Sequence, residues 1–118
     1  MLRYNLQKLF NLRGITNPTI YLQRNGFKDY TSYKIAYNEF KYLPLETMEK
    51  LCLLLNCTPN DMMEWIPDST QTQNENIALR KLITTQKDFN LSHVIHEVPV
   101  EKMNEFVEKV EELKKNIL

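Results

Sequence analysis

The sequence predicts an all-α fold, with five short helices in one small domain and a further helical segment after it. Gly14 and Gly26 are the only glycines among 118 residues, too few for the tight turns of a many-stranded β fold. Apolar side chains recur three and four residues apart along most of the chain, as on the buried face of a helix. Asparagine, threonine or proline precedes several of these runs, where such residues favour a helix start.

The first two helices are expected to be short. Apolar side chains share one face over residues 2–13, and Gly14 is suited to end this helix because glycine tolerates a positive φ. The second helix is predicted from Pro18 to about Asn25, since proline fits the first turn of a helix. Gly26 then turns the chain. The expected N-cap is Thr16 or Asn17, and the expected buried side chains are Ile20 with Tyr21 or Leu22, and then Phe27.

The third predicted helix, residues 28–38, is rich in tyrosine and lysine, whereas the fourth is rich in leucine. On the third we expect Thr31, Ser32 and Ile35 to be buried and Tyr30, Tyr33, Lys34 and Tyr37 to lie on open faces. Residues 38–43 are predicted to form a loop. The fourth helix begins near Pro44 and can end at Asn56. Its apolar positions are Leu45, Met48, Leu51, Cys52 and Leu55.

A strong start signal predicts the fifth helix. Thr58 stands as N-cap, Pro59 occupies the first helical position, and Asp61 lies where a capping box places an acid. The helix is expected to end before Pro67, because proline disfavours helical geometry in the residue before it. Residues 1–66 are therefore predicted to form one small helical domain.

The rest of the chain divides into a linker and a helical segment. After Pro67, every residue to 76 has a polar side chain, so residues 67–76 are predicted to form a polar linker. In the C-terminal segment, residues 77–118, a helix is expected over 77–83, while 89–98 fits a helix or a short strand. A last helix opens at Pro99. It carries an apolar seam spaced like a coiled coil: Met103, Phe106, Val110, Leu113 and Ile117. This seam can pack within the chain or act as a dimerisation element between two copies.

The charges separate along a chain that is neutral overall. Residues 1–43 carry seven basic and two acidic side chains, a net charge of +5, and the remainder carries −5. All six tyrosines lie in the basic part. A local surplus of cations with aromatic hydroxyl groups favours a polyanionic partner. The alternative is that the tyrosines pack a small core and the lysines merely solvate it.

Three stretches carry a resemblance to a known family: residues 2–15, the Asn-Gly-Phe turn at 25–27, and above all residues 45–65. Together they resemble a divergent member of the Cro/repressor-like (XRE-type) helix-turn-helix family, over about residues 2–66. The resemblance implies a five-helix repressor-like domain whose recognition helix, about 28–38, enters the major groove of double-stranded DNA. The DNA-binding residues that it implies are Thr16, Asn17, Lys28, Asp29, Tyr30, Tyr33, Lys34, Lys41 and Tyr42.

These side chains suit the chemistry of DNA recognition. Lysine can donate to guanine or to phosphate, and Asp29 can accept from cytosine. Tyrosine can reach a phosphate or touch a thymine methyl group. Thr16 and Asn17 would donate to a backbone phosphate, and Lys41 and Tyr42 lie in a loop that commonly meets the backbone in this family. We therefore expect a sequence-specific DNA-binding transcriptional regulator, a homodimer without enzymatic activity or cofactor. The alternative is a protein–protein interaction module or an antitoxin built on the same scaffold.

Other signals in the sequence favour no second chemistry. His93 and His96 are three residues apart but lack further well-placed metal ligands. Cys52 and Cys57 do not form a CxxC motif and are expected to be reduced core thiols. No apolar run approaches the ~20 residues that span a bilayer, and residues 1–5 lack the apolar stretch of a secretory signal. We expect a cytoplasmic location and no membrane partner.

Overall fold

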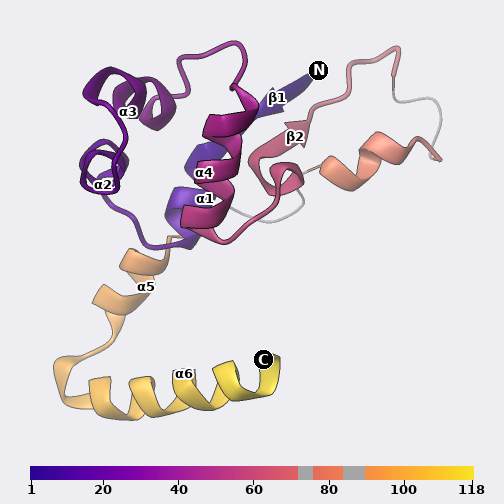
Figure 1. The fold of residues 1–118 in the computed structure, drawn as a ribbon. Coiled ribbons are helices and arrows are strands. Elements are labelled where there is room, and N and C mark those ends of the chain that lie inside the picture. Colours follow the sequence, from indigo (N-terminus) through magenta and orange to yellow (C-terminus); the bar gives the residue numbers. More distant parts are fainter. Residues whose placement is uncertain (72–75, 84–89) are drawn as a thin grey trace.

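The computed structural model describes residues 1–71, 76–83 and 90–118, and it is mostly helical (Figure 1). The α-helices are α1 (Leu6–Leu12), α2 (Pro18–Arg24), α3 (Asp29–Ala36), α4 (Leu45–Leu55), α5 (Leu91–Glu97) and α6 (Met103–Ile117). Three 3-10 helices accompany them: η1 (Pro59–Met62), η2 (Ala78–Leu82) and η3 (Val100–Lys102). Two short strands, β1 (Leu2–Tyr4) and β2 (Met63–Trp65), complete the described elements. The predicted helical fold class with a C-terminal helical segment is confirmed.

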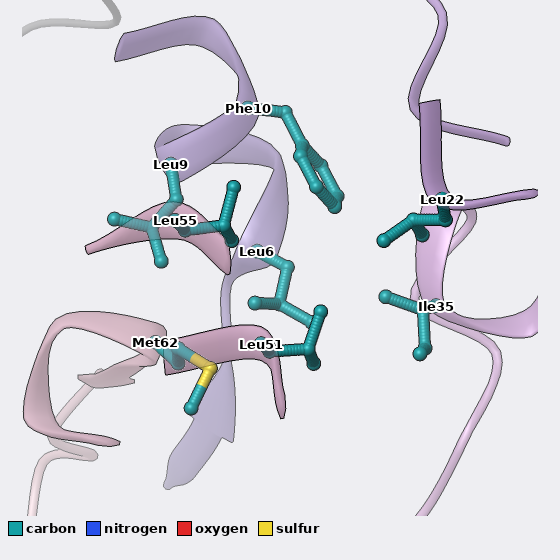
Figure 2. Close-up of a cluster of buried hydrophobic side chains, with 8 residues drawn as sticks. All are labelled: Leu6, Leu9, Phe10, Leu22, Ile35, Leu51, Leu55 and Met62. Carbon is teal, nitrogen blue, oxygen red and sulfur yellow. The ribbon is translucent and has the colours of Figure 1, made fainter. Parts of the chain in front are cut away.

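One apolar core joins the first four helices (Figure 2). Side chains of α1 and α4 face each other, while α2 and α3 each contribute one buried apolar side chain from the other side. The core side chains are Leu6, Leu9, Phe10, Leu22, Ile35, Leu51, Leu55 and Met62. Their helical spacing is the pattern that predicted these helices, since each helix turns one apolar face inward.

The predicted limits of the first and fifth helices are wrong, because both segments contribute to a small sheet. Strand β1 pairs antiparallel with β2, with Leu2 opposite Trp65 and Arg3 opposite Glu64. Helix α1 begins only after Asn5, whose side chain accepts a hydrogen bond from the backbone N–H of Lys8 at 3.3 Å. Residues 2–4 are therefore extended rather than helical. Strands of three residues are too short for alternation to show in the sequence.

The capping box after α4 forms as predicted, but it starts a single 3-10 turn. The Asp61 carboxylate accepts from the backbone N–H of Thr58 at 2.9 Å and from the Thr58 hydroxyl at 3.1 Å. The chain then leaves η1 as strand β2, which buries Trp65 and pairs its backbone with β1. Tertiary strand pairing has overridden the local preference for helix.

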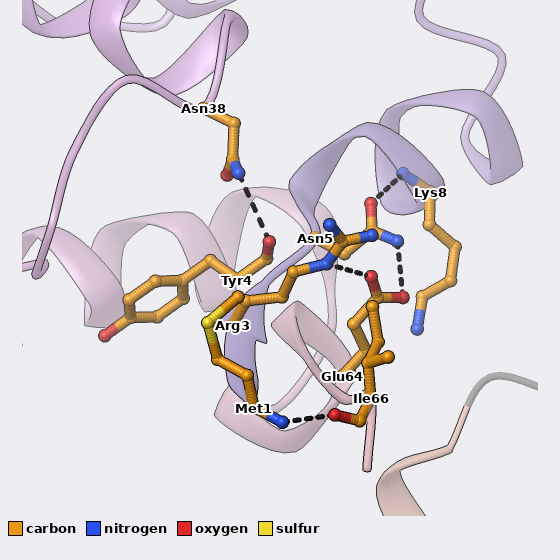
Figure 3. A network of polar contacts seen from close by, with 8 residues as sticks. All are labelled: Met1, Arg3, Tyr4, Asn5, Lys8, Asn38, Glu64 and Ile66. Carbon is orange, nitrogen blue, oxygen red and sulfur yellow. Dashed lines mark hydrogen bonds and ion pairs between the residues drawn. The ribbon is translucent and has the colours of Figure 1, made fainter. Parts of the chain in front are cut away.

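Polar contacts fasten the two ends of the domain together around the buried Glu64 (Figure 3). The Arg3 guanidinium donates to one carboxylate oxygen of Glu64, and the Asn5 amide donates to the other at 2.8 Å. The backbone N–H of Ile66 donates to the carbonyl of Met1 at 2.9 Å. The N-terminus and the end of the domain therefore form one unit, although they are more than 60 residues apart in sequence.

The predicted helix ends at Gly14 and Asn56 are confirmed. Gly14 follows α1 with φ of 70°, and Asn56 ends α4 in the left-handed region with φ of 50°. The Arg13 side chain donates to the carbonyl oxygens of Leu55 and Asn56, at 2.9 and 3.2 Å. These bonds satisfy acceptors that a helix end leaves without intrahelical partners.

Two predicted core positions are wrong. Ile20 is 42% exposed because α2 turns Leu22, rather than Ile20, into the core. Leu45 is 82% exposed, since it is the first residue of α4 and precedes the turn that meets the core. On α3, Ser32 and Ile35 are buried as predicted, and Thr31 is half-buried.

The C-terminal segment extends away from the domain (Figure 1). The predicted helix at 77–83 is the 3-10 helix η2, and residues 91–97 form a helix rather than a strand. Leu91 of α5 approaches Gly14 at the end of α1, whereas α6 lies at the opposite end of the molecule from α3. The predicted linker, 67–76, lies partly outside the described residues, and Phe89 lies outside them. In the described part of the chain, no helix is long and apolar enough to cross a membrane.

Candidate nucleic-acid interface

Helices α2 and α3 pack against each other, and a short turn joins them. Asn17 caps α2 by accepting from the backbone N–H of Ile20 at 3.2 Å, and Pro18 begins the helix, as predicted. Gly26 makes the turn with φ of 92°, a backbone conformation that residues with a Cβ rarely adopt. Phe27 packs against the core at this point. The turn therefore fixes the direction in which α3 leaves α2.

Helix α3 has one face in the core and one face in water. Ser32 and Ile35 anchor it. On the other face, Tyr30 and Tyr33 are 73% and 46% exposed, and Lys28 and Asp29 at its start are exposed too. The tyrosines are therefore not core residues, and that alternative for this cluster is wrong.

Contacts among the exposed tyrosines and the half-buried Lys34 organise this face. The Lys34 ammonium lies 5.3 Å from the centre of the Tyr30 ring, a cation–π distance. It also lies 3.9 Å from the Glu39 carboxylate, at the outer limit for an ion pair. The rings of Tyr33 and Tyr37 are 4.8 Å apart, centre to centre. Weak contacts of this kind orient the side chains and still leave them able to bind another molecule.

The loop after α3 carries two more of the predicted residues, Lys41 and Tyr42, and both are exposed. Its course is fixed by β1, because the Asn38 amide donates to the carbonyl of Tyr4 at 3.3 Å (Figure 3). The rings of Tyr4 and Phe40 also lie 5.1 Å apart. Between loop and helix lies an open hollow of about 270 Å³, lined in part by Tyr30, Lys34, Phe40 and Tyr42. The strand pair that the sequence did not predict thus positions this loop beside α3.

The remaining predicted residues, Thr16 and Asn17, are exposed at the start of α2. They line a second open hollow, of about 530 Å³, together with Arg24. Sequence reasoning left Arg24 and Tyr37 out of the candidate site, although both are exposed. The spacing of four between Tyr33 and Tyr37 is the signal that could have included Tyr37.

A family model described as the Cro/C1-type HTH DNA-binding domain matches residues 5–68, more than half of the chain. The chain belongs to this family. The resemblance drawn from the sequence is thereby confirmed. No curated protein and no solved structure matches the chain. Membership in the Cro/C1-type family supports a DNA-binding regulator, and such domains are typically non-enzymatic.

Outside the Cro/C1-type domain, α6 presents the predicted dimerisation residues on one face. Met103 and Phe106 are half-buried near the start of the helix. Farther along, Val110, Leu113 and Ile117 are exposed. Much of this apolar seam is therefore open to solvent in the single chain.

The cysteines and histidines are the remaining candidates for chemistry. Both thiols are free and half-buried against the core, and burial, followed by the neighbouring Cys52, raises the pKa of Cys57 to about 11. A thiol with such a pKa stays protonated at neutral pH and is a poor nucleophile. His93 and His96 are exposed on α5. Among the residues that the structure describes, no group of three or more metal-binding side chains comes together.

Proposed function

We propose that the chain is a sequence-specific transcriptional regulator that places α3 in the major groove of double-stranded DNA. The observation that carries the proposal is the outward face of α3, where tyrosines and lysines gather on a helix anchored by Ser32 and Ile35. A helix held by one face and polar on the other can enter a groove without disturbing the core.

The proposed roles follow from position and chemistry. Lys28 is the N-cap of α3, and Asp29 and Tyr30 lie in its first turn, the part of a recognition helix that meets base edges. Tyr33 and Lys34 follow one turn later. Lysine ammonium groups donate to guanine or phosphate, and a tyrosine ring can contact a thymine methyl group.

Residues on both sides of α3 would hold the DNA backbone. Asn17 uses its side-chain oxygen to cap α2, so its amide nitrogen is the atom that can donate to a phosphate. Thr16 lies beside it, and Lys41 and Tyr42 lie on the loop at the other side. Contacts to the backbone fix the register of the helix, whereas contacts to bases select the sequence.

We further propose a division of labour along the chain. Residues 1–66 bind DNA, and residues 77–118 bring two copies together through the apolar seam of α6. Residues 67–76 link these two parts. A homodimer would present two copies of α3 to a pseudo-palindromic site whose halves are about 34 Å apart. Two linked contacts bind more tightly than one because the second becomes intramolecular.

Fluorescence anisotropy with duplex DNA at several salt concentrations tests the proposal. Each phosphate contact contributes about −0.9 to the slope of log affinity against log salt. Lys41→Ala removes an exposed lysine assigned to the DNA backbone; it should weaken binding and reduce the slope by about 1, with little change in melting temperature. Lys115→Ala removes the same charge from exposed α6 and should have no such effect. Equal effects of the two variants, or no binding at low salt, would favour the protein–protein interaction module instead.

A further inference from the structure

The apolar seam of α6 becomes more exposed toward the C-terminal end of the helix. Phe106 is half-buried, whereas Val110, Leu113 and Ile117 are 45%, 59% and 82% exposed. In Figure 1, α6 stands apart from the domain and is reached through α5. A helix of two heptads is marginal without a partner for its apolar face. The exposed part of the seam is therefore the part that needs to be covered.

We propose that α6 of a second copy covers the seam in antiparallel orientation, with Phe106 against the partner's Ile117 and Val110 against the partner's Leu113. The seam is complementary to itself, because its spacings of four, three and four read the same in both directions from Phe106 to Ile117. This proposal rests on the proposed homodimer and does not depend on DNA binding.

Charge decides against the parallel orientation. With the seam at positions a and d of the heptad, Lys109 occupies g and Lys114 occupies the following e. Parallel helices pair g with the partner's next e, which would set Lys109 against the partner's Lys114 on both sides. Within its own chain, Lys109 lies 3.6 Å from Glu105, an exposed pair that is worth little. The repulsion would therefore remain.

The antiparallel orientation removes this conflict. Position e then faces the partner's e, which sets Lys114 opposite the partner's Val107. Position g faces the partner's g, which sets Lys109 opposite the partner's Asn116. Val107 is half exposed and apolar, and a lysine can cover it with its methylene stem while its ammonium stays in water. Each lysine thus gains a neighbour without like charge.

Exposure also selects the register. A shift by one heptad would pair Phe106 with the partner's Val110, but it would leave Ile117 uncovered and set Lys109 against the partner's Lys109. Met103, which the shifted register would cover, is already half-buried in its own chain. The register from Phe106 to Ile117 covers the three exposed seam residues, Val110, Leu113 and Ile117, and leaves out the half-buried Met103.

Disulfide crosslinking in the full-length protein tests orientation and register together. Mixed Val110→Cys and Leu113→Cys chains should crosslink under mild oxidation, and so should mixed Phe106→Cys and Ile117→Cys chains. Ile117→Cys alone should not, because its two copies would lie about 16 Å apart along the helix axis. The unsubstituted protein controls for the native thiols, and peptide mass mapping locates each crosslink.

The outcomes separate the two proposals. Efficient crosslinking of Ile117→Cys with itself would show a parallel pair and overturn the inference. A monomer by light scattering, with no crosslink in either mixture, would overturn it as well. The expected crosslinks together with no DNA binding would support the antiparallel pair and refute the DNA-binding regulator.

Discussion

Replacing Arg3 by alanine should destabilise the domain, even though Arg3 lies at its surface. The side chain of Arg3 is 50% exposed, but that of its partner Glu64 is only 6% exposed. Removing the guanidinium leaves a buried carboxylate with one strong donor fewer. Breaking a fully buried ion pair in this way costs about 3–5 kcal/mol. Water can replace the exposed half of this pair, so we expect about 1–2 kcal/mol.

Urea unfolding followed by circular dichroism measures this loss. Each kcal/mol should lower the melting temperature of a domain of this size by about 4–8 °C. Lys50→Ala is the matched control, because it removes an exposed cation from α4 and should change stability by less than about 0.5 kcal/mol. The double variant Arg3→Ala with Glu64→Ala should lose less than the sum of the two single variants. Equal stability of Arg3→Ala and Lys50→Ala would refute the role given to this pair.

Three further predictions concern the core, a helix end and a thiol. Leu51→Ala removes a fully buried side chain and should cost about 2–5 kcal/mol in urea unfolding; a loss below 1 kcal/mol would contradict the core described above. Asn56→Ala should cost about 1 kcal/mol because φ is 50° there, whereas Asn56→Gly should be tolerated; equal losses in thermal unfolding would argue against that backbone strain. The folded-state pKa of Cys57, about 11, lies above its ordinary value of 9.0, so its contribution to stability is present below pH 9 and lost as pH rises toward 11. The melting temperature of the unsubstituted protein should therefore fall more over this range than that of Cys57→Ala, and parallel curves would exclude the effect.

The parts of the fold that the sequence predicted are those with a local signal. Asn17 and Pro18 define the start of α2, Gly26 makes the turn between α2 and α3, and both signals act as expected. Leucine spacing located α4, and Asn56 ends it. In each case the residues that carry the signal also make the local contact, so the element can be predicted from the sequence alone.

The strand pair could not be predicted because its signal is not local. Residues 2–4 continue the apolar spacing of α1, and their partner strand follows a capping box that is typical of a helix start. Pairing with β2, which sets Arg3 opposite Glu64, makes the extended conformation favourable. The consequence reaches the candidate interface, because Tyr4 on β1 holds the loop that carries Lys41 and Tyr42.

The candidate interface was predicted mainly from family resemblance and charge. The structure brings Lys28, Tyr30, Tyr33 and Lys34 to one helix whose opposite face is buried. It also shows what the sequence could not, namely that the Lys34 ammonium lies near both the Tyr30 ring and the Glu39 carboxylate. Such contacts depend on how the chain leaves α3, and no spacing rule fixes that path.

Anisotropy of labelled DNA, measured with the unsubstituted protein and with Tyr33→Ala, tests the central claim most directly. A duplex selected from a random library and a scrambled duplex of equal length serve as the two ligands. If α3 reads bases, the unsubstituted protein should prefer the selected duplex, and Tyr33→Ala should lose most of that preference while retaining its melting temperature. Equal affinity for both duplexes, or a preference that Tyr33→Ala leaves intact, would contradict the assignment of α3 as the recognition helix.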